Sequence, residues 1–189
     1  MTISRCGRGS RKRNGTNAEQ GFSLLEILIS LVVFMIAAGA AVSSLVSTIS
    51  LGRVSSETGR ALDAAHDMIE RIQGETFNEV FARYNANPAD DPGGAGTAPG
   101  NGFAVFGLNP QAGDPDGLVG EIFFPGNGTQ LREDVVDREL GMPRDLNGDG
   151  FVDGNDHAMN YEVIPVRVRI RWFGTRNSNV VIGTTIANS

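Results

Sequence analysis

A long apolar run near the amino terminus constrains this chain more than any other feature. Residues 22–42 read FSLLEILISLVVFMIAAGAAV, and Glu26 is the single charged residue among these 21. As a helix rising about 1.5 Å per residue, the run spans about 31 Å, which matches the roughly 30 Å hydrocarbon core of a bilayer. The run therefore predicts one transmembrane helix over residues 22–43.

The carboxylate of Glu26 is unusual in such a segment. An acidic group inside a bilayer costs a few kcal/mol unless another group pairs with it, so it indicates a functional residue with a partner. Alternatively, Glu26 lies at the membrane interface near the positive end of the helix dipole, where no partner is needed. The run alone leaves both interpretations open.

The flanking residues favour a membrane anchor over a secretory signal peptide. The apolar region of a signal peptide has about 7 to 15 residues, and this run is longer. Basic residues precede it and keep that end of the helix in the cytoplasm. They are Arg5, Arg8, Arg11, Lys12 and Arg13, against the single acid Glu19.

The junction GFSLLE resembles the class III signal of type IV prepilins and type II secretion pseudopilins, and the resemblance covers Gly21 to Val42. It implies that residues 1–21 are a leader and that a prepilin peptidase cuts between Gly21 and Phe22 and methylates Phe22. It also implies that Glu26 acts in filament assembly.

The chemistry of the junction agrees with these implied roles. Cleavage creates an α-ammonium group on Phe22, and the pKa of such a group is ordinarily about 7.7 to 8.0. Helical side chains lean toward the amino terminus, so the Glu26 carboxylate points back to that level of the membrane. Spacing does not decide whether the partner ammonium belongs to the same chain. The resemblance implies a neighbouring subunit, so that the pair would check axial register.

Charge and cysteine content limit the rest of the chain. The leader holds five of the 16 basic and one of the 22 acidic residues, which leaves a net charge of −10 after cleavage. We therefore expect no nucleic-acid partner. The one cysteine, Cys6, lies in the leader, so the mature chain has neither a disulfide nor a thiolate metal site.

Helical periodicity continues over residues 44–84. Apolar residues recur at three- and four-residue steps and predict an amphipathic helix that ends near Gly74, with a short helix over 75–84. The apolar positions are Leu45, Ile49, Ala61, Leu62, Ala65, Met68, Ile69 and Ile72. Residues 85–101 have no aromatic or branched aliphatic side chain and predict a flexible loop, which is either simply mobile or in contact with neighbouring subunits.

The remaining residues, 102–189, predict a β-rich head. Strands are expected in residues 102–108 and 118–124, and a hairpin is expected from 166–172 and 179–187. In VRVRIRW, apolar residues alternate with Arg167, Arg169 and Arg171, which predicts one buried face. The arginine row is either a binding stripe for DNA or an acidic partner, or it is a solvated face or the protection of a sheet edge; we favour the second pair of interpretations.

The segment DLNGDGFVDGND, residues 145–156, resembles the calcium loop of EF-hand and dockerin proteins. Oxygen-bearing side chains stand at positions 1, 3, 5, 9 and 12, and glycine stands at position 6. The predicted Ca²⁺ ligands are Asp145, Asn147, Asp149, Asp153 and Asp156, together with the carbonyl of Phe151.

The alternative is an Asp- and Gly-rich turn without metal. Four carboxylates without a cation among them would repel one another, and a divalent ion relieves this repulsion. Position 12 lacks glutamate and little exiting helix follows, so switching like that of calmodulin is not expected. His157 is expected to take no part, because Ca²⁺ prefers oxygen ligands.

Together these features predict an α+β, pilin-like fold in which a long amino-terminal helix packs on a small antiparallel sheet. The expected function is structural: a minor pilin or pseudopilin that enters or primes a type IV pilus or a type II secretion pseudopilus. A calcium-dependent binding module at a filament tip is the alternative. No nucleophile with a base, zinc spacing or phosphate loop indicates an enzyme.

The same resemblance implies the partners and the location. Expected partners are the prepilin peptidase, other pilins or pseudopilins, the inner-membrane assembly platform and membrane lipid. The subunit is expected to cross the inner membrane once, with a cytoplasmic amino terminus and a periplasmic or extracellular head, before it enters the filament.

Overall fold

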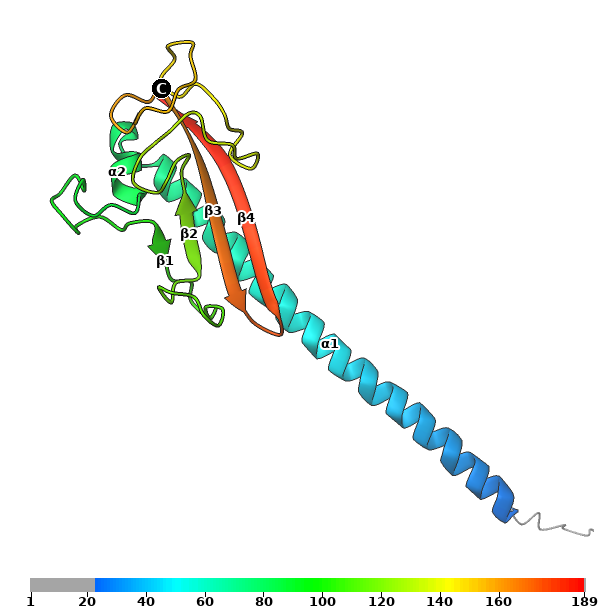
Figure 1. Cartoon of the computed structure of the whole chain (residues 1–189). Coiled ribbons are helices and arrows are strands. Elements are labelled where there is room, and N and C mark those ends of the chain that lie inside the picture. Colours follow the sequence, from blue (N-terminus) through cyan, green and yellow to red (C-terminus); the bar gives the residue numbers. More distant parts are fainter. Residues whose placement is uncertain (1–22, 189) are drawn as a thin grey trace, which may run out of the picture. The chain divides into compact units, whose positions relative to one another are not determined.

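The computed structural model describes residues 23–188 (Figure 1). The chain divides into two compact units, one that ends at Val46 and one that begins at Ser47. The helix α1, Leu24–Gln73, contributes to both. All side chains of residues 23–49 are exposed, and α1 contains an 18-residue window of mean hydropathy 2.5. It is thus long and apolar enough to cross a membrane.

The second unit combines the rest of α1 with a small antiparallel sheet. A 3₁₀ turn, η1 (Phe77–Glu79), leads into the short helix α2 (Val80–Tyr84), as expected for residues 75–84. The strands are β1 (Gly102–Phe103), β2 (Gly120–Phe123), β3 (Val163–Phe173) and β4 (Asn177–Ala187). Their spatial order is β1-β2-β3-β4, and each neighbouring pair is antiparallel. The α+β, pilin-like fold is confirmed (Figure 1).

The core of this unit contains the buried face of the strand β3 and the buried face of the helix α1. From Val166 to Trp172 of β3 every second side chain is buried, because successive side chains of a strand point to opposite faces, and Ile164 and Pro165 before them are buried too. The buried apolar side chains on this face are Ile164, Val166, Val168, Ile170 and Trp172. The same core cluster contains Ala61, Ala65, Met68, Ile69 and Ile72 of α1. Leu62, expected on this stripe, is 39% exposed, because it lies on the flank of the buried face.

The three arginines of β3 lie on the opposite face of the sheet and are paired with acids. Arg167 contacts Asp137 and Glu139, at 2.9 and 2.7 Å. Arg169 contacts Glu121, and its guanidinium lies 4.5 Å from the centroid of the Phe123 ring.

Arg171 completes the row, with Asp114 at 3.7 Å and Glu121 at 3.4 Å. The strand itself lies between β2 and β4, so protection of a sheet edge is the wrong interpretation of the row. Each arginine has an acidic partner within the head.

The loop between α2 and β1 is held by its own polar groups. The Asn85 amide donates to Asp90, 2.9 Å away, and the Ala98 amide donates to Asp91 at 3.1 Å. The Gly100 amide reaches back to the Arg83 carbonyl at 3.1 Å. These bonds shape residues 85–101, and the flexibility expected of this segment stays a prediction.

We predict that Ile170→Ala destabilises the head far more than Val181→Ala. Ile170 is 0% exposed, and removing it leaves a cavity that costs about 2 to 5 kcal/mol. Val181 is 38% exposed on β4, opposite Arg169, and its truncation should cost under about 1 kcal/mol. Urea unfolding of a fragment starting at Ser47 measures both. Equal losses would contradict the assignment of the buried face.

Candidate functional site

The first turn of α1 positions the predicted assembly residue. Ser23 precedes the helix, and Glu26 is its third residue. The amide groups of Glu26 and Ile27 donate to the Ser23 carbonyl, at 2.9 and 3.2 Å. Glu26 therefore lies at the positive end of the helix dipole, a position compatible with both interpretations of its charge. Gly21 and Phe22, between which cleavage is predicted, lie outside the described residues.

The first half of the Asp- and Gly-rich loop is organised by Asp145. Its Oδ1 accepts a bond from the Gly148 amide at 2.7 Å, and its Oδ2 accepts one from the Gly150 amide at 2.8 Å. The two glycines have φ values of +77° and +85°, which other residues adopt only with strain. The bond from Gly150 is the main reason that the pKa of Asp145 is lowered, so this carboxylate stays ionised.

The next two predicted ligands bond within the same loop. Asn147 Oδ1 accepts from the Asp149 amide at 3.1 Å, and Asp149 Oδ1 accepts from the Phe151 amide at 2.8 Å. Such bonds from a side chain to the amide two residues on are turn-forming. The Phe151 side chain, whose carbonyl is a predicted ligand, is 74% exposed.

The last two predicted ligands turn toward other segments. Asp153 Oδ1 accepts from the Asn155 amide at 2.7 Å and lies 3.0 Å from His157 Nε2. Asp156 Oδ1 accepts from the amides of Leu131 and Ala158, at 3.0 and 3.1 Å. The calcium site therefore stays a prediction.

A buried carboxylate, Glu133, holds both ends of this loop. Its side chain is 1% exposed. Oε1 accepts from the amides of Leu146 and Asn147, at 2.7 and 3.2 Å, and Oε2 accepts from the Asp153 amide at 3.2 Å. Bonds from amides to an ionised acceptor are among the stronger hydrogen bonds. One side chain thus fixes the loop from residue 146 to residue 153.

His157 lies beside this carboxylate. Its side chain is 5% exposed, and Nε2 lies 3.0 Å from Asp153 Oδ1 and 3.7 Å from Glu133 Oε2. Nδ1 lies 3.3 Å from Asn160 Oδ1. Burial by itself lowers the pKa of His157, but the bond to Asp153 and the charges of Glu133 and Asp153 outweigh burial, so that the pKa is raised.

Glu133, Asp153 and His157 each offer one donor atom, and these atoms lie within 4.8 Å of one another. Among residues 23–188, this is the group of histidine, cysteine and acidic side chains placed closely enough to hold a metal ion. Of the predicted ligands, only Asp153 belongs to it. Sequence reasoning missed Glu133 and set His157 aside, because nothing in the local pattern distinguishes Glu133 from the acids around it.

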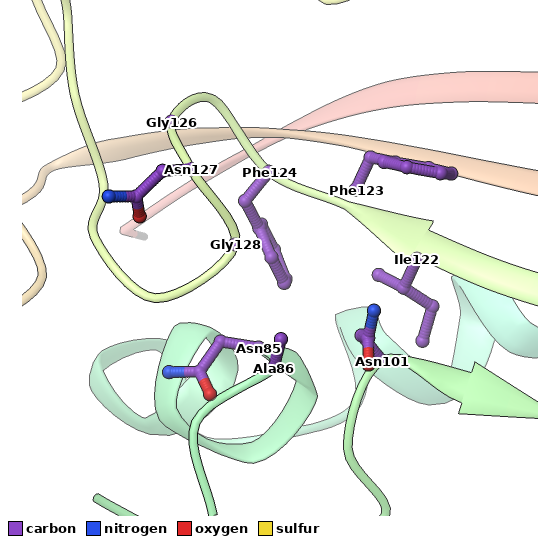
Figure 2. A pocket seen from close by; sticks show the side chains of 9 residues that line it. All are labelled: Asn85, Ala86, Asn101, Ile122, Phe123, Phe124, Gly126, Asn127 and Gly128. Atoms are coloured by element: carbon purple, nitrogen blue, oxygen red, sulfur yellow. The ribbon is translucent and has the colours of Figure 1, made fainter. Parts of the chain in front are cut away.

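A separate cavity of about 380 Å³ lies between α2, β2 and the turn that follows β2 (Figure 2). The Phe124 ring points toward Ala86, whereas the Phe123 ring points away. The Asn85 and Asn127 amides are engaged by Asp90 and Gln130. The nine lining residues include no ionisable side chain, so the cavity offers no acid or base. They are Asn85, Ala86, Asn101, Ile122, Phe123, Phe124, Gly126, Asn127 and Gly128.

Comparison with known proteins gives one match. Residues 16–42 fit the family model described as the prokaryotic N-terminal methylation motif. The match includes the predicted cleavage point and the amino-terminal part of α1, and it supports a class III signal peptide. No curated protein and no solved structure matches the chain.

We predict that Glu133→Ala destabilises the head by about 3 to 5 kcal/mol, because three amides, one of them fully buried, lose their acceptor and the buried His157 loses a counter-charge. The matched control is Asp134→Ala. Asp134 pairs with Arg132 at the surface, with side-chain exposures of 41% and 37%, and such pairs contribute under about 1 kcal/mol. Denaturant unfolding measures both losses. Similar values for the two variants would refute the role of Glu133.

Proposed function

We propose that this chain, a processed subunit of the type IV pilin or pseudopilin kind by its methylation motif, is a minor subunit. It would enter or prime a type IV pilus or a type II secretion pseudopilus, and its role would be structural rather than catalytic. One observation carries this proposal. The helix α1 presents exposed apolar side chains through residue 46 and then contributes buried residues to the head from Ala61 onward. One helix is thus both anchor and core element.

The exposed apolar half of α1 needs a non-aqueous partner. Large side chains such as Leu24, Phe34 and Ile36 are 69 to 81% exposed. Membrane lipid would cover them before assembly, and the equivalent helices of neighbouring subunits would cover them afterwards. The prepilin peptidase and the inner-membrane assembly platform are the other partners we propose. The basic leader supports a cytoplasmic amino terminus, with the head outside the cytoplasm.

We also propose that residues 145–156 bind Ca²⁺. Asp145, Asn147 and Asp149 carry their side-chain oxygens on one short loop, and the Asp145 carboxylate stays ionised. Each carboxylate oxygen that accepts one amide bond has a second lone pair for an ion. Oxygen donors of this kind are the ligands that Ca²⁺ prefers. Bound calcium would neutralise the repulsion among the loop's carboxylates and stabilise its fold.

The alternative function, a binding or adhesion module displayed at a filament tip, draws support from exposed apolar side chains near this loop. Phe151, within the loop, is 74% exposed, and Met159, three residues after the loop, is 96% exposed. Exposed large apolar groups indicate contact with another molecule when they are grouped. A filament that assembles normally but loses adhesion when Phe151 is replaced by serine would favour this second function.

The first prediction here concerns processing. Protein made together with its native peptidase should begin at methylated Phe22, as measured by mass spectrometry of the intact chain. Replacing Gly21 by a bulky residue should leave the precursor uncut, whereas replacing Gly15 in the same leader should not. A mature terminus within residues 37–41 would instead identify a secretory signal.

The second prediction concerns Glu26. Glu26→Ala removes a charge from the membrane helix, so membrane insertion should be unchanged or better. Incorporation into filaments should fall, because the ammonium of the neighbouring subunit loses its partner. Quantitative blotting of sheared filaments and membranes separates the two steps, and Ser30→Ala serves as control. Normal incorporation of Glu26→Ala would rule out the charge pair.

The third prediction concerns calcium. A fragment starting at Ser47 should melt at a higher temperature in Ca²⁺ than in chelator, with a smaller response to Mg²⁺. An ion in hundredfold excess over Kd adds about 2.7 kcal/mol, and Kd for a site of the extracellular kind is about 0.1 to 1 mM. Asp145→Ala or Asp149→Ala should abolish the difference, whereas Asp114→Ala should retain it. No shift and no calorimetric signal at millimolar Ca²⁺ would leave the loop a metal-free turn.

A further inference from the structure

The buried imidazole of His157 faces two acceptors. Its Nε2 is directed at one oxygen each of Asp153 and Glu133, at 3.0 and 3.7 Å. Its other nitrogen, Nδ1, lies beside the side-chain oxygen of Asn160. When Nδ1 carries a hydrogen and donates it to Asn160, Nε2 presents a lone pair to two carboxylate oxygens. The lone pair and the two carboxylate oxygens then repel one another. A cation between the three atoms, either a proton on Nε2 or a metal ion, removes this repulsion.

No other cation of the described residues supplies this charge. Within residues 23–188, no arginine forms an ion pair with Glu133 or Asp153; the nearby Arg132 pairs with Asp134 instead. The Glu133 carboxylate is almost fully buried, so solvent screens its charge poorly. The position between these donor atoms is therefore strongly favourable to a small cation.

The donor set and its spacing select among cations. Four tetrahedral ligands about 2.0 Å from a zinc ion lie about 3.3 Å from one another, and the two separations from Nε2, 3.0 and 3.7 Å, bracket this value. Calcium takes six to eight oxygens at longer distances. One imidazole with two carboxylates suits zinc and other first-row transition metals. The Asn160 oxygen beside Nδ1 is the outer partner that orients a metal-bound histidine.

We propose that Glu133, Asp153 and His157 form a binding site for a divalent transition metal, with zinc as the best fit. The site differs in donor chemistry from the proposed calcium loop, with which it shares Asp153, and it does not depend on the filament function. Three protein ligands leave a fourth position for water or for a group from another molecule. The Asp153 side chain is 41% exposed, so this side of the site is open to solvent.

A bound metal is expected to cross-link and stabilise the longest segment without regular structure. Residues 124–162 contain no named helix or strand within the described chain, and no cysteine lies in this segment. A metal would join residue 133 to residues 153 and 157, across the loop that Glu133 already organises. Binding to the folded form alone then raises stability in proportion to the logarithm of the metal concentration.

The test uses the full processed chain in detergent, purified without a histidine tag and stripped of metal by a chelator. The chain contains two histidines, which gives a matched pair of variants. His66 is an exposed residue of α1 whose Nδ1 contacts the Leu62 carbonyl. Zinc chloride is titrated into wild type, His157→Gln and His66→Gln, with calorimetry for affinity and elemental analysis for stoichiometry.

We expect one zinc per chain for wild type and His66→Gln, at least tenfold weaker binding for His157→Gln, and no comparable competition by magnesium. Asp153→Asn, at a partly exposed position, is a second variant that should fold and also bind at least tenfold more weakly. Cobalt in place of zinc should give visible absorption bands that disappear in both site variants. The proposal is overturned by a folded wild type that binds no zinc, or by zinc binding that survives in Asp153→Asn and His157→Gln. A lone proton on His157 then explains the cluster.

Discussion

The packing of α1 against the sheet is the interaction on which the rest of the head depends. Ala61 and Ala65 are 0% exposed and belong to the same core cluster as the inward side chains of β3. Near the carboxyl end of β3, Trp172 donates a hydrogen bond from Nε1 to Glu57 Oε2 at 3.2 Å. The chain has one cysteine, Cys6, so no disulfide within the chain supports this contact. Close packing of helix on sheet must therefore supply most of the stability.

The two elements that form this contact are also those most readily predicted from sequence. The seven residues 166–172, with period two, define most of β3, and a repeated three- and four-residue step defines the buried face of α1. The place of β3 within the sheet was not predictable in the same way. A strand's pattern shows which of its faces is buried, but whether another strand pairs with each of its edges depends on residues far away. Edge protection, one of the explanations that the arginine row allows, fails for this reason, because β4 pairs with the strand along its whole length.

In the loop of residues 145–156, too, contacts between residues close in sequence could be predicted, whereas contacts with distant residues could not. Asp145, Asn147 and Asp149 bond to amides a few residues on, so their spacing and the following glycines predict the turns that they form. The role of Glu133 depends on amides 13 to 20 residues away in the chain. In the segment REDVVDREL it is one of four acids, and no periodicity marks it as buried. Burial of a carboxylate follows from tertiary contacts that supply its donors, and a single sequence does not reveal them.

Asp153 belongs to both proposed metal sites, the calcium loop and the group that it forms with Glu133 and His157. Its Oδ1 lies beside His157, while its Oδ2 accepts a hydrogen bond from the side-chain nitrogen Nδ2 of Asn155 at 2.6 Å. A calcium ion bound at Asp145 would compete for the Asp153 carboxylate with a transition-metal ion bound by Glu133 and His157. The two proposed ions therefore oppose each other unless Asp153 offers one oxygen to each, and by linkage the opposition must be equal in both directions. The local concentrations of the two metals would then decide which one stabilises the loop.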